Sequence, residues 1–192
     1  MRARDNPFAT ARLEELPFEF PDGMSWEVLL QRIVSLDYRG AIVGPKGSGK
    51  TTLLNELQAE LVERGFIPIR ARLDKQHQHF SPEFWQEFSS QITSRNAVLL
   101  DGAEQLDART WKRFLREASP ASGVIITSHR SGLLPTLVEC RTSAALFRRL
   151  VGHLVEPPTL DGLPLDQIYA KYQGNVRSAL LELYDHFAAL PA

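Results

Sequence analysis

The stretch at positions 44–52 combines glycines, a lysine and hydroxyl side chains at a spacing that suits phosphate binding. It reads Gly44-Pro45-Lys46-Gly47-Ser48-Gly49-Lys50-Thr51-Thr52 and matches the pattern G-x-x-x-x-G-K-[ST]. Glycines let backbone N–H groups approach phosphate oxygens closely, and Lys50 can place a positive charge on the β and γ phosphates. The Thr51 hydroxyl can ligate Mg²⁺. We therefore predict that this loop binds a nucleoside triphosphate.

Hydrolysis needs two further groups, a carboxylate that holds the metal and a residue that activates water. The apolar run at 97–100 ends in Asp101, and the carboxyl end of a buried parallel strand is where such sheets place ligands. We predict that Asp101 ligates Mg²⁺ together with Thr51. Glu104 follows closely and could polarise the attacking water, or it could begin the next helix as a surface residue. Both interpretations stay open here.

A second apolar run, at 123–126, ends in the hydroxyl residues Thr127 and Ser128. Either hydroxyl could bond to the γ-phosphate or to its attacking water, and either could instead simply cap the strand end. His129 and Arg130 follow in a loop, where such residues are usually solvated. Arg130 could also reach a phosphate or a neighbouring subunit.

The elements that position these residues alternate between short apolar runs and helical patterns. Strands are expected at 39–43, 66–73, 97–101, 123–127 and 137–140. Strands that alternate with helices behind a phosphate loop predict an α/β, three-layer P-loop NTPase fold with a five-stranded parallel sheet. Pro68 has no N–H to donate, so the strand at 66–73 is expected at a sheet edge.

We expect three segments: an N-terminal arm at 1–24, a P-loop NTPase core at 25–156 and a small helical lid at 157–192. The arm carries several large apolar residues, so it either packs on the core or covers the base of the nucleotide. Pro157-Pro158 is expected to be the linker to the lid. Helix N-caps are expected at Ser25, Ser81, Asp107, Thr142 and Asn175.

The bulk composition limits the function classes. A net charge of −1 gives no general attraction to nucleic acid, although Lys112, Arg113 and Arg116 share one helix side that could meet a partner, a phosphate backbone or only solvent. The single cysteine, Cys140, excludes an internal disulfide and favours a cytoplasmic location. No apolar run approaches the roughly 18 residues of a membrane helix, so membrane insertion is not expected.

The phosphate loop, the strand ending in Asp101, the polar tip at Thr127 and Ser128, and Gly174-Asn175-Val176-Arg177 together resemble the AAA+ branch of P-loop ATPases. That resemblance implies that Thr127 or Ser128 acts as sensor 1, and that Arg177 acts as sensor 2 against the γ-phosphate. Asn6-Pro7-Phe8 and Asp101-Gly102-Ala103-Glu104 are also similar to DEAQ-box ATPases, which serve secretion and transposition systems. The Thr-x-His-Arg strand tip resembles small uncharacterised bacterial P-loop ATP-binding proteins.

One departure from the AAA+ pattern bears on function: Gly102 stands where that family usually has Glu. The expected function is therefore slow Mg²⁺-dependent ATP hydrolysis by a nucleotide-dependent regulator. The alternatives are an ATP-gated interaction module without hydrolysis and a small-molecule kinase with its acceptor site at 74–80. No Asn-Lys-x-Asp base reader for GTP occurs, which favours ATP. An unidentified protein partner, nucleotide-dependent self-association and DNA are the candidate partners.

Overall fold

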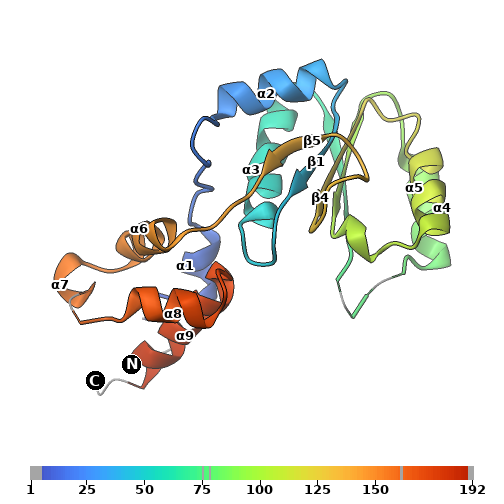
Figure 1. The fold of residues 1–192 in the computed structure, drawn as a ribbon. Coiled ribbons are helices and arrows are strands. Elements are labelled where there is room, and N and C mark those ends of the chain that lie inside the picture. The colour runs from blue at the N-terminus through green and yellow to red at the C-terminus, as the bar shows by residue number, and fades with distance from the viewer. Residues whose placement is uncertain (1–5, 75, 78, 161, 190–192) are drawn as a thin grey trace. The chain divides into compact units, whose positions relative to one another are not determined.

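The computed structural model describes residues 6–74, 76–77, 79–160 and 162–189 (Figure 1). Contacts between Cα atoms divide the chain into two compact units. The sheet unit comprises Phe20–Gly44 and Lys50–Cys140, and the helical unit comprises Pro45–Gly49 with the described parts of Met1–Glu19 and Arg141–Ala192. The phosphate loop thus begins and ends in the sheet unit, while its central residues cluster with the helical unit.

The sheet unit contains a five-stranded sheet in the order β2-β3-β4-β1-β5, and every pair of neighbouring strands is parallel. This confirms the predicted α/β fold, and β2 lies at the edge as Pro68 predicted. β3 and β4 are buried along their whole length, as expected of strands covered on both faces. The strands are β1 (Arg39–Val43), β2 (Ile67–Arg72), β3 (Asn96–Asp101), β4 (Gly123–Ser128) and β5 (Thr136–Glu139).

Helices cover both faces of this sheet. On one face, α4 (Pro82–Gln91) and α5 (Ala108–Glu117) bury Trp85, Phe88 and Phe114 against alternate strand residues. The intervening residues Ile42 of β1, Leu99 of β3 and Ile125 of β4 are also fully buried and point the other way. On that face α3 (Lys50–Glu63) contacts β1 to β4, and α2 (Trp26–Ser35) contacts β5. Figure 1 shows α2 and α3 on the side of the sheet opposite α4 and α5.

The helical unit contains its own hydrophobic core. Phe8 is fully buried in that core, and its ring centroid lies 5.2 Å from that of Phe187. Asn6 Nδ2 donates a 2.9 Å hydrogen bond to the carbonyl oxygen of Tyr184, so the start of the described chain is tied to the closing helix. The helices of this unit are α1 (Thr10–Glu14), α6 (Ala144–Leu154), α7 (Pro157–Leu160), α8 (Leu165–Lys171) and α9 (Val176–Ala188).

The structure corrects two predicted helix boundaries in this unit. The N-cap of α6 is Ser143, whose Oγ accepts from Leu146 N, whereas the Thr142 hydroxyl donates to the carbonyl oxygen of Gly174. Pro157-Pro158 is not a linker, because these residues begin α7. A proline suits the first helical turn, where its missing N–H would have no helical partner. The segment boundaries at 24/25 and 156/157 stay a prediction.

Candidate nucleotide-binding site

Asp101 is buried at the carboxyl end of β3, and hydroxyl groups from two other elements hold its carboxylate. Oδ2 accepts a 2.9 Å hydrogen bond from Thr51 Oγ1, in the first turn of α3. Oδ1 accepts a 2.6 Å hydrogen bond from Thr127 Oγ1, in β4, and the same hydroxyl accepts from Gly102 N at 2.9 Å. The structure therefore brings together three of the predicted site residues, with Asp101 at the centre.

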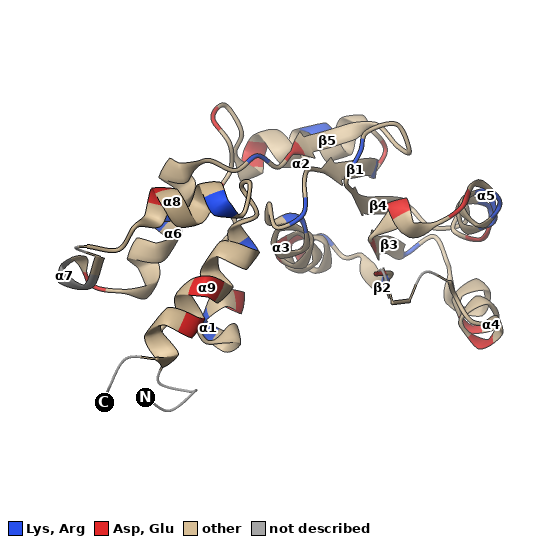
Figure 2. Ribbon diagram, turned by 60° about the horizontal axis from the view of Figure 1, so that its bottom comes forward, with Lys and Arg blue, Asp and Glu red and all other residues tan. Residues whose placement is uncertain are grey.

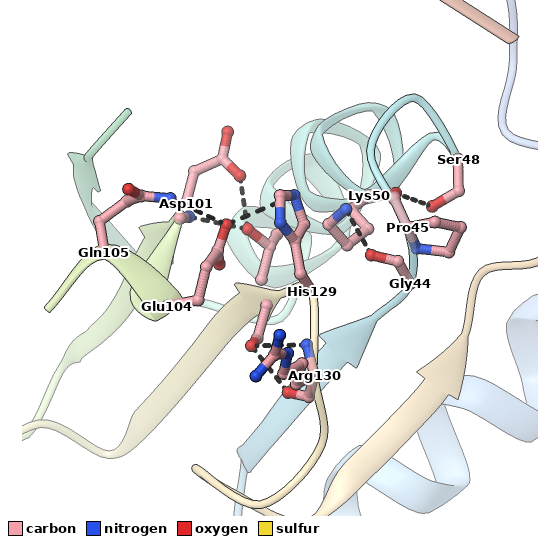
Figure 3. Close-up of polar contacts among 12 residues, drawn as sticks. Gly44, Pro45, Ser48, Lys50, Asp101, Glu104, Gln105, His129 and Arg130 are labelled. Atoms are coloured by element: carbon pink, nitrogen blue, oxygen red, sulfur yellow. Dashed lines mark hydrogen bonds and ion pairs between the residues drawn. The ribbon is translucent and has the colours of Figure 1, made fainter. Parts of the chain in front are cut away.

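Lys50 lies beside this carboxylate as a buried cation. Its Nζ donates a 2.8 Å hydrogen bond to the carbonyl oxygen of Gly44, at the start of the loop (Figure 3). Burial lowers the pKa of Lys50, while the negative charge of Glu104, and less strongly that of Asp101, opposes this shift. The ammonium group thus lies in a site whose negative charges balance its burial only in part, and a phosphate would stabilise it there.

The phosphate loop turns at two glycines with left-handed backbone, Gly47 at φ +76° and Gly49 at φ +86°. Ser48 Oγ closes the turn by donating a 2.9 Å hydrogen bond to the carbonyl oxygen of Pro45. A Cβ atom on Gly47 would lie 2.0 Å from Asn175 Oδ1, so this loop touches the residue that caps α9. Of the remaining loop residues, Gly44 is buried, Lys46 is exposed and Thr52 is half-buried in the first turn of α3.

Glu104 lies on the short 3₁₀ helix η2 (Ala103–Gln105) that follows Asp101. Its Oε1 is 3.4 Å from His129 Nε2 and 3.3 Å from Gln105 Nε2 (Figure 3). Its Oε2 is buried and has no hydrogen-bond partner among the described residues. From the sequence, His129 was interpreted as a solvated loop residue. Its position directly after the polar tip of β4 was the sequence signal that could have placed it near the site.

Two further residues were predicted for the site, Ser128 and Arg177. Ser128 is buried, but its Oγ donates to the carbonyl oxygen of Arg130 and accepts from Arg130 N, so it closes its own turn. Of the two strand-tip hydroxyls, only that of Thr127 has a hydrogen bond to Asp101 among those described. Arg177 is exposed in the first turn of α9, within the helical unit, and its sensor role stays a prediction.

Neither a protein-family model nor a curated protein matches this chain. Among solved structures, AMPPCP-bound DnaA from Aquifex aeolicus matches with a TM-score of 0.55 and 20% identity over 87% of this chain and 62% of DnaA. A DNA replication initiation factor matches with a TM-score of 0.53 and 19% identity over 90% of this chain and 65% of that one. The chain has a P-loop NTPase fold like that of DnaA. It spans less than two thirds of either neighbour.

These neighbours support the AAA+ resemblance at the level of the P-loop NTPase fold. The finer resemblances, to DEAQ-box ATPases and to small bacterial P-loop proteins, gain no support from them and stay predictions.

The local backbone explains why a glycine stands at position 102, where the AAA+ pattern usually has Glu. Its φ is +88°, and an added Cβ would lie 2.3 Å from the carbonyl oxygen of Leu73, so a glutamate side chain does not fit at that position.

The donors at the site suit Mg²⁺. Thr51 and Asp101 offer hydroxyl and carboxylate oxygens 2.9 Å apart, and Mg²⁺ in phosphate sites takes one or two such protein oxygens beside the substrate phosphates. The described residues contain no group of three or more His, Cys, Asp or Glu side chains that could hold a metal by themselves. His77 Nδ1 lies 3.2 Å from Asp74 Oδ1 in an exposed pair.

A basic stripe, formed by Arg109, Lys112, Arg113 and Arg116, runs along the exposed side of α5 (Figure 2). The guanidinium carbon of Arg113 lies 4.2 Å from the centre of the Trp85 ring, and Arg116 pairs with Glu117 at 3.0 Å.

Within the described part of the chain, no helix is long and apolar enough to cross a membrane.

Proposed function

We propose that this protein binds Mg·ATP and hydrolyses it slowly, as a nucleotide-dependent regulator. The observation that carries this proposal is the Asp101 carboxylate, held between the hydroxyl of the phosphate-loop helix and that of the neighbouring strand. Such a carboxylate beside the loop lysine is what distinguishes a metal-dependent phosphate site from a phosphate-binding turn. The triphosphate analogue AMPPCP bound to the neighbour DnaA supports ATP as the ligand.

In this proposal the backbone of residues 44–49 cradles the phosphates, and Lys50 exchanges its hydrogen bond with Gly44 for a terminal phosphate oxygen. Thr51 and Asp101 would hold Mg²⁺, which supplies charge neutralisation on the β and γ phosphates when bound. Thr127 keeps the Asp101 carboxylate in one orientation. Glu104 orients water through Oε2, the oxygen that has no hydrogen-bond partner among the described residues.

Slow turnover is proposed because the water-orienting carboxylate does not directly follow Asp101. Gly102 occupies that position with a backbone and a neighbour that exclude a side chain. Glu104 instead approaches from η2, three residues after Asp101 in the chain. A base that is displaced from the usual position is expected to hold the attacking water less well, and small misplacements of catalytic groups slow a reaction steeply.

The direct test is phosphate release from Mg·ATP by the purified chain and by its Lys50→Ala and Asp101→Asn variants. Both variants are expected to abolish release, because the first removes the phosphate-facing charge and the second the proposed metal ligand. Lys112→Ala and Asp22→Asn are matched controls, since both residues are exposed outside the proposed site. Turnover that survives in both site variants would contradict the assignment.

A second function, an ATP-gated interaction module, is favoured by the contact between the loop and α9. Asn175 caps α9 through Ser178 N and also touches Gly47, so phosphates in the loop would meet the start of that helix. Arg177 is proposed to contact the γ-phosphate from there. This function predicts that AMPPCP, without turnover, changes hydrogen exchange in α9 or the molecular mass. Unchanged exchange and mass at saturating AMPPCP would count against it.

The binding partner of this protein is proposed only as a class of molecule. An unidentified protein, a second copy of the chain and DNA are the candidates, and DNA enters because one structural neighbour is a DNA replication initiation factor. The basic stripe on α5 is the surface that would meet a polyanion. The small-molecule kinase alternative gains no specific observation, and its acceptor segment at 74–80 lies partly outside the described residues.

A further inference from the structure

We propose that His129 is a positioning residue for Glu104: it holds Oε1 of that carboxylate and thereby leaves Oε2 to orient and deprotonate the attacking water. The inference rests on the proposed hydrolysis and adds to it a residue that the phosphate-loop pattern does not assign. It concerns only groups of the sheet unit, where η2 and the loop after β4 lie at the carboxyl ends of adjacent strands.

The two oxygens of Glu104 have different surroundings. Oε1 accepts a 3.3 Å hydrogen bond from Gln105 Nε2 and lies 3.4 Å from His129 Nε2. Oε2 is buried without a hydrogen-bond partner among the described residues. A buried carboxylate oxygen that lacks a donor is costly, so this atom is expected to accept from water or from a ligand.

The charge of Glu104 acts on the lysine of the phosphate loop. It opposes the lowering of the Lys50 pKa by burial, and it does so more strongly than the charge of Asp101. Lys50 is the residue expected to contact the terminal phosphates, so this coupling accords with the proposed role of Glu104 beside them.

An ordinary surface ion pair does not account for these observations as well. His129 is 39% exposed and Glu104 20%, and pairs of this kind add little to stability. The asymmetry between the oxygens is instead what orienting a base requires, since one oxygen must be fixed for the other to point in one direction. His129 is placed for this because it directly follows the buried strand end Thr127-Ser128.

The step conserves atoms and electrons without a redox partner. The water oxygen forms a bond to the γ phosphorus, and the bond from that phosphorus to the bridging oxygen breaks. ADP leaves with the electron pair of the broken bond, and the water proton passes to Glu104 Oε2. His129 touches neither water nor phosphate in this scheme, so it acts only through Glu104.

The test compares His129→Ala, His129→Gln and Glu104→Gln with the unmodified chain, and measures phosphate release alongside the dissociation constant for AMPPCP. His129→Ala should lower kcat about 10- to 100-fold, a part of what a general base contributes, while AMPPCP affinity stays within about twofold. His129→Gln should recover part of kcat, because its amide still donates. Combining His129→Ala with Glu104→Gln should lower kcat no further than Glu104→Gln alone. His186→Ala, an exposed histidine in the last turn of α9, is the matched control.

The contact between His129 and Glu104 can also be tested by a measurement that does not depend on ATP turnover. The Nε2 resonance of His129, followed by nitrogen NMR, should shift in Glu104→Gln, since the charged partner is lost. Phosphate release with an unaltered kcat in His129→Ala, or an unmoved resonance, would overturn the positioning role while leaving the proposed function intact. No release by the unmodified chain, with AMPPCP still bound, would overturn both the hydrolytic function and the role of His129.

Discussion

The hydroxyl of Thr127 joins Asp101 to the backbone that follows it: Oγ1 donates to Asp101 Oδ1 at 2.6 Å and accepts from Gly102 N at 2.9 Å. All three groups are buried. One side chain from β4 therefore fixes both the carboxylate at the end of β3 and the left-handed turn after it. The Thr127 hydroxyl therefore has a structural role that does not require a bound nucleotide.

Replacing Thr127 with Val should destabilise the protein and reduce nucleotide-dependent activity together. The substitution keeps the shape but leaves Asp101 Oδ1 and Gly102 N without their partner, and an unsatisfied buried polar group costs about 1–3 kcal/mol. Urea unfolding monitored by circular dichroism measures the loss. Thr127→Ser, which retains the hydroxyl, should recover most of it. Equal stability of the Val and Ser variants would contradict the hydrogen-bonding role.

Gly102→Ala should lower the free energy of unfolding more than Gly65→Ala does. Both glycines have left-handed backbone, at φ +88° and +85°, so both substitutions carry the same conformational strain of about 1–2 kcal/mol. Only the Cβ at position 102 meets another atom, the carbonyl oxygen of Leu73 at 2.3 Å, while position 65 is open. The difference between the variants therefore isolates the steric contact. Gly102→Glu should be at least as destabilised as Gly102→Ala, and a faster ATPase from it would refute this account.

The pH dependence of nucleotide binding should report on Lys50. Burial lowers the pKa of Lys50 in the folded, unliganded protein from its usual 10.5, and phosphate binding favours the charged form. Affinity for AMPPCP should therefore fall as pH rises through this lowered pKa, and binding should take up protons in that range. Calorimetry in two alkaline buffers of different ionisation enthalpy measures the uptake. Lys50→Arg, which stays protonated, should lose this pH dependence; a persistent one would assign it elsewhere.

Cys140 should be an unreactive thiol in the folded protein. It is buried, and burial raises its pKa to about 12, so almost no thiolate exists near neutral pH. Ellman's reagent at pH 8 should label it slowly in buffer and at once in denaturant. Because the chain has a single cysteine, the labelled amount reports its unfolded or locally opened fraction directly. Rapid labelling without denaturant would contradict the burial of β5 and the residue after it.

The sequence predicted those parts of the site in which the functional side chain and the pattern that predicts its backbone structure lie in the same short segment. The loop glycines and Lys50 form one continuous segment, and Asp101 ends a strand whose apolar run is itself the signal for burial. Pro68 predicted an edge strand because a missing donor has few tolerable positions in a sheet. In each case the information lies within a few neighbouring residues.

The parts that the sequence did not predict depend on contacts across the chain. His129 meets Glu104 because η2 turns that side chain toward the end of β4, and no local pattern contains this pairing. Ser143, not Thr142, caps α6 because the Thr142 hydroxyl is taken by the carbonyl oxygen of Gly174, 32 residues away. Ser and Thr are both favoured N-cap residues, so the sequence alone does not decide between two that are adjacent. Here the hydrogen bond to a distant residue decides it.

The edge strand β2 has a consequence for association. Ile67 and Leu73 donate their N–H groups inward, to carbonyl oxygens at Arg95 and Asp101, so the alternate positions 68, 70 and 72 face the open edge. Pro68 therefore removes a donor on the side where a foreign strand would dock, and two arginines occupy the remaining outward positions. The opposite edge, β5, is only four residues long. Both borders of the sheet are thus poor templates for amyloid-like strand addition, which leaves self-association to other surfaces.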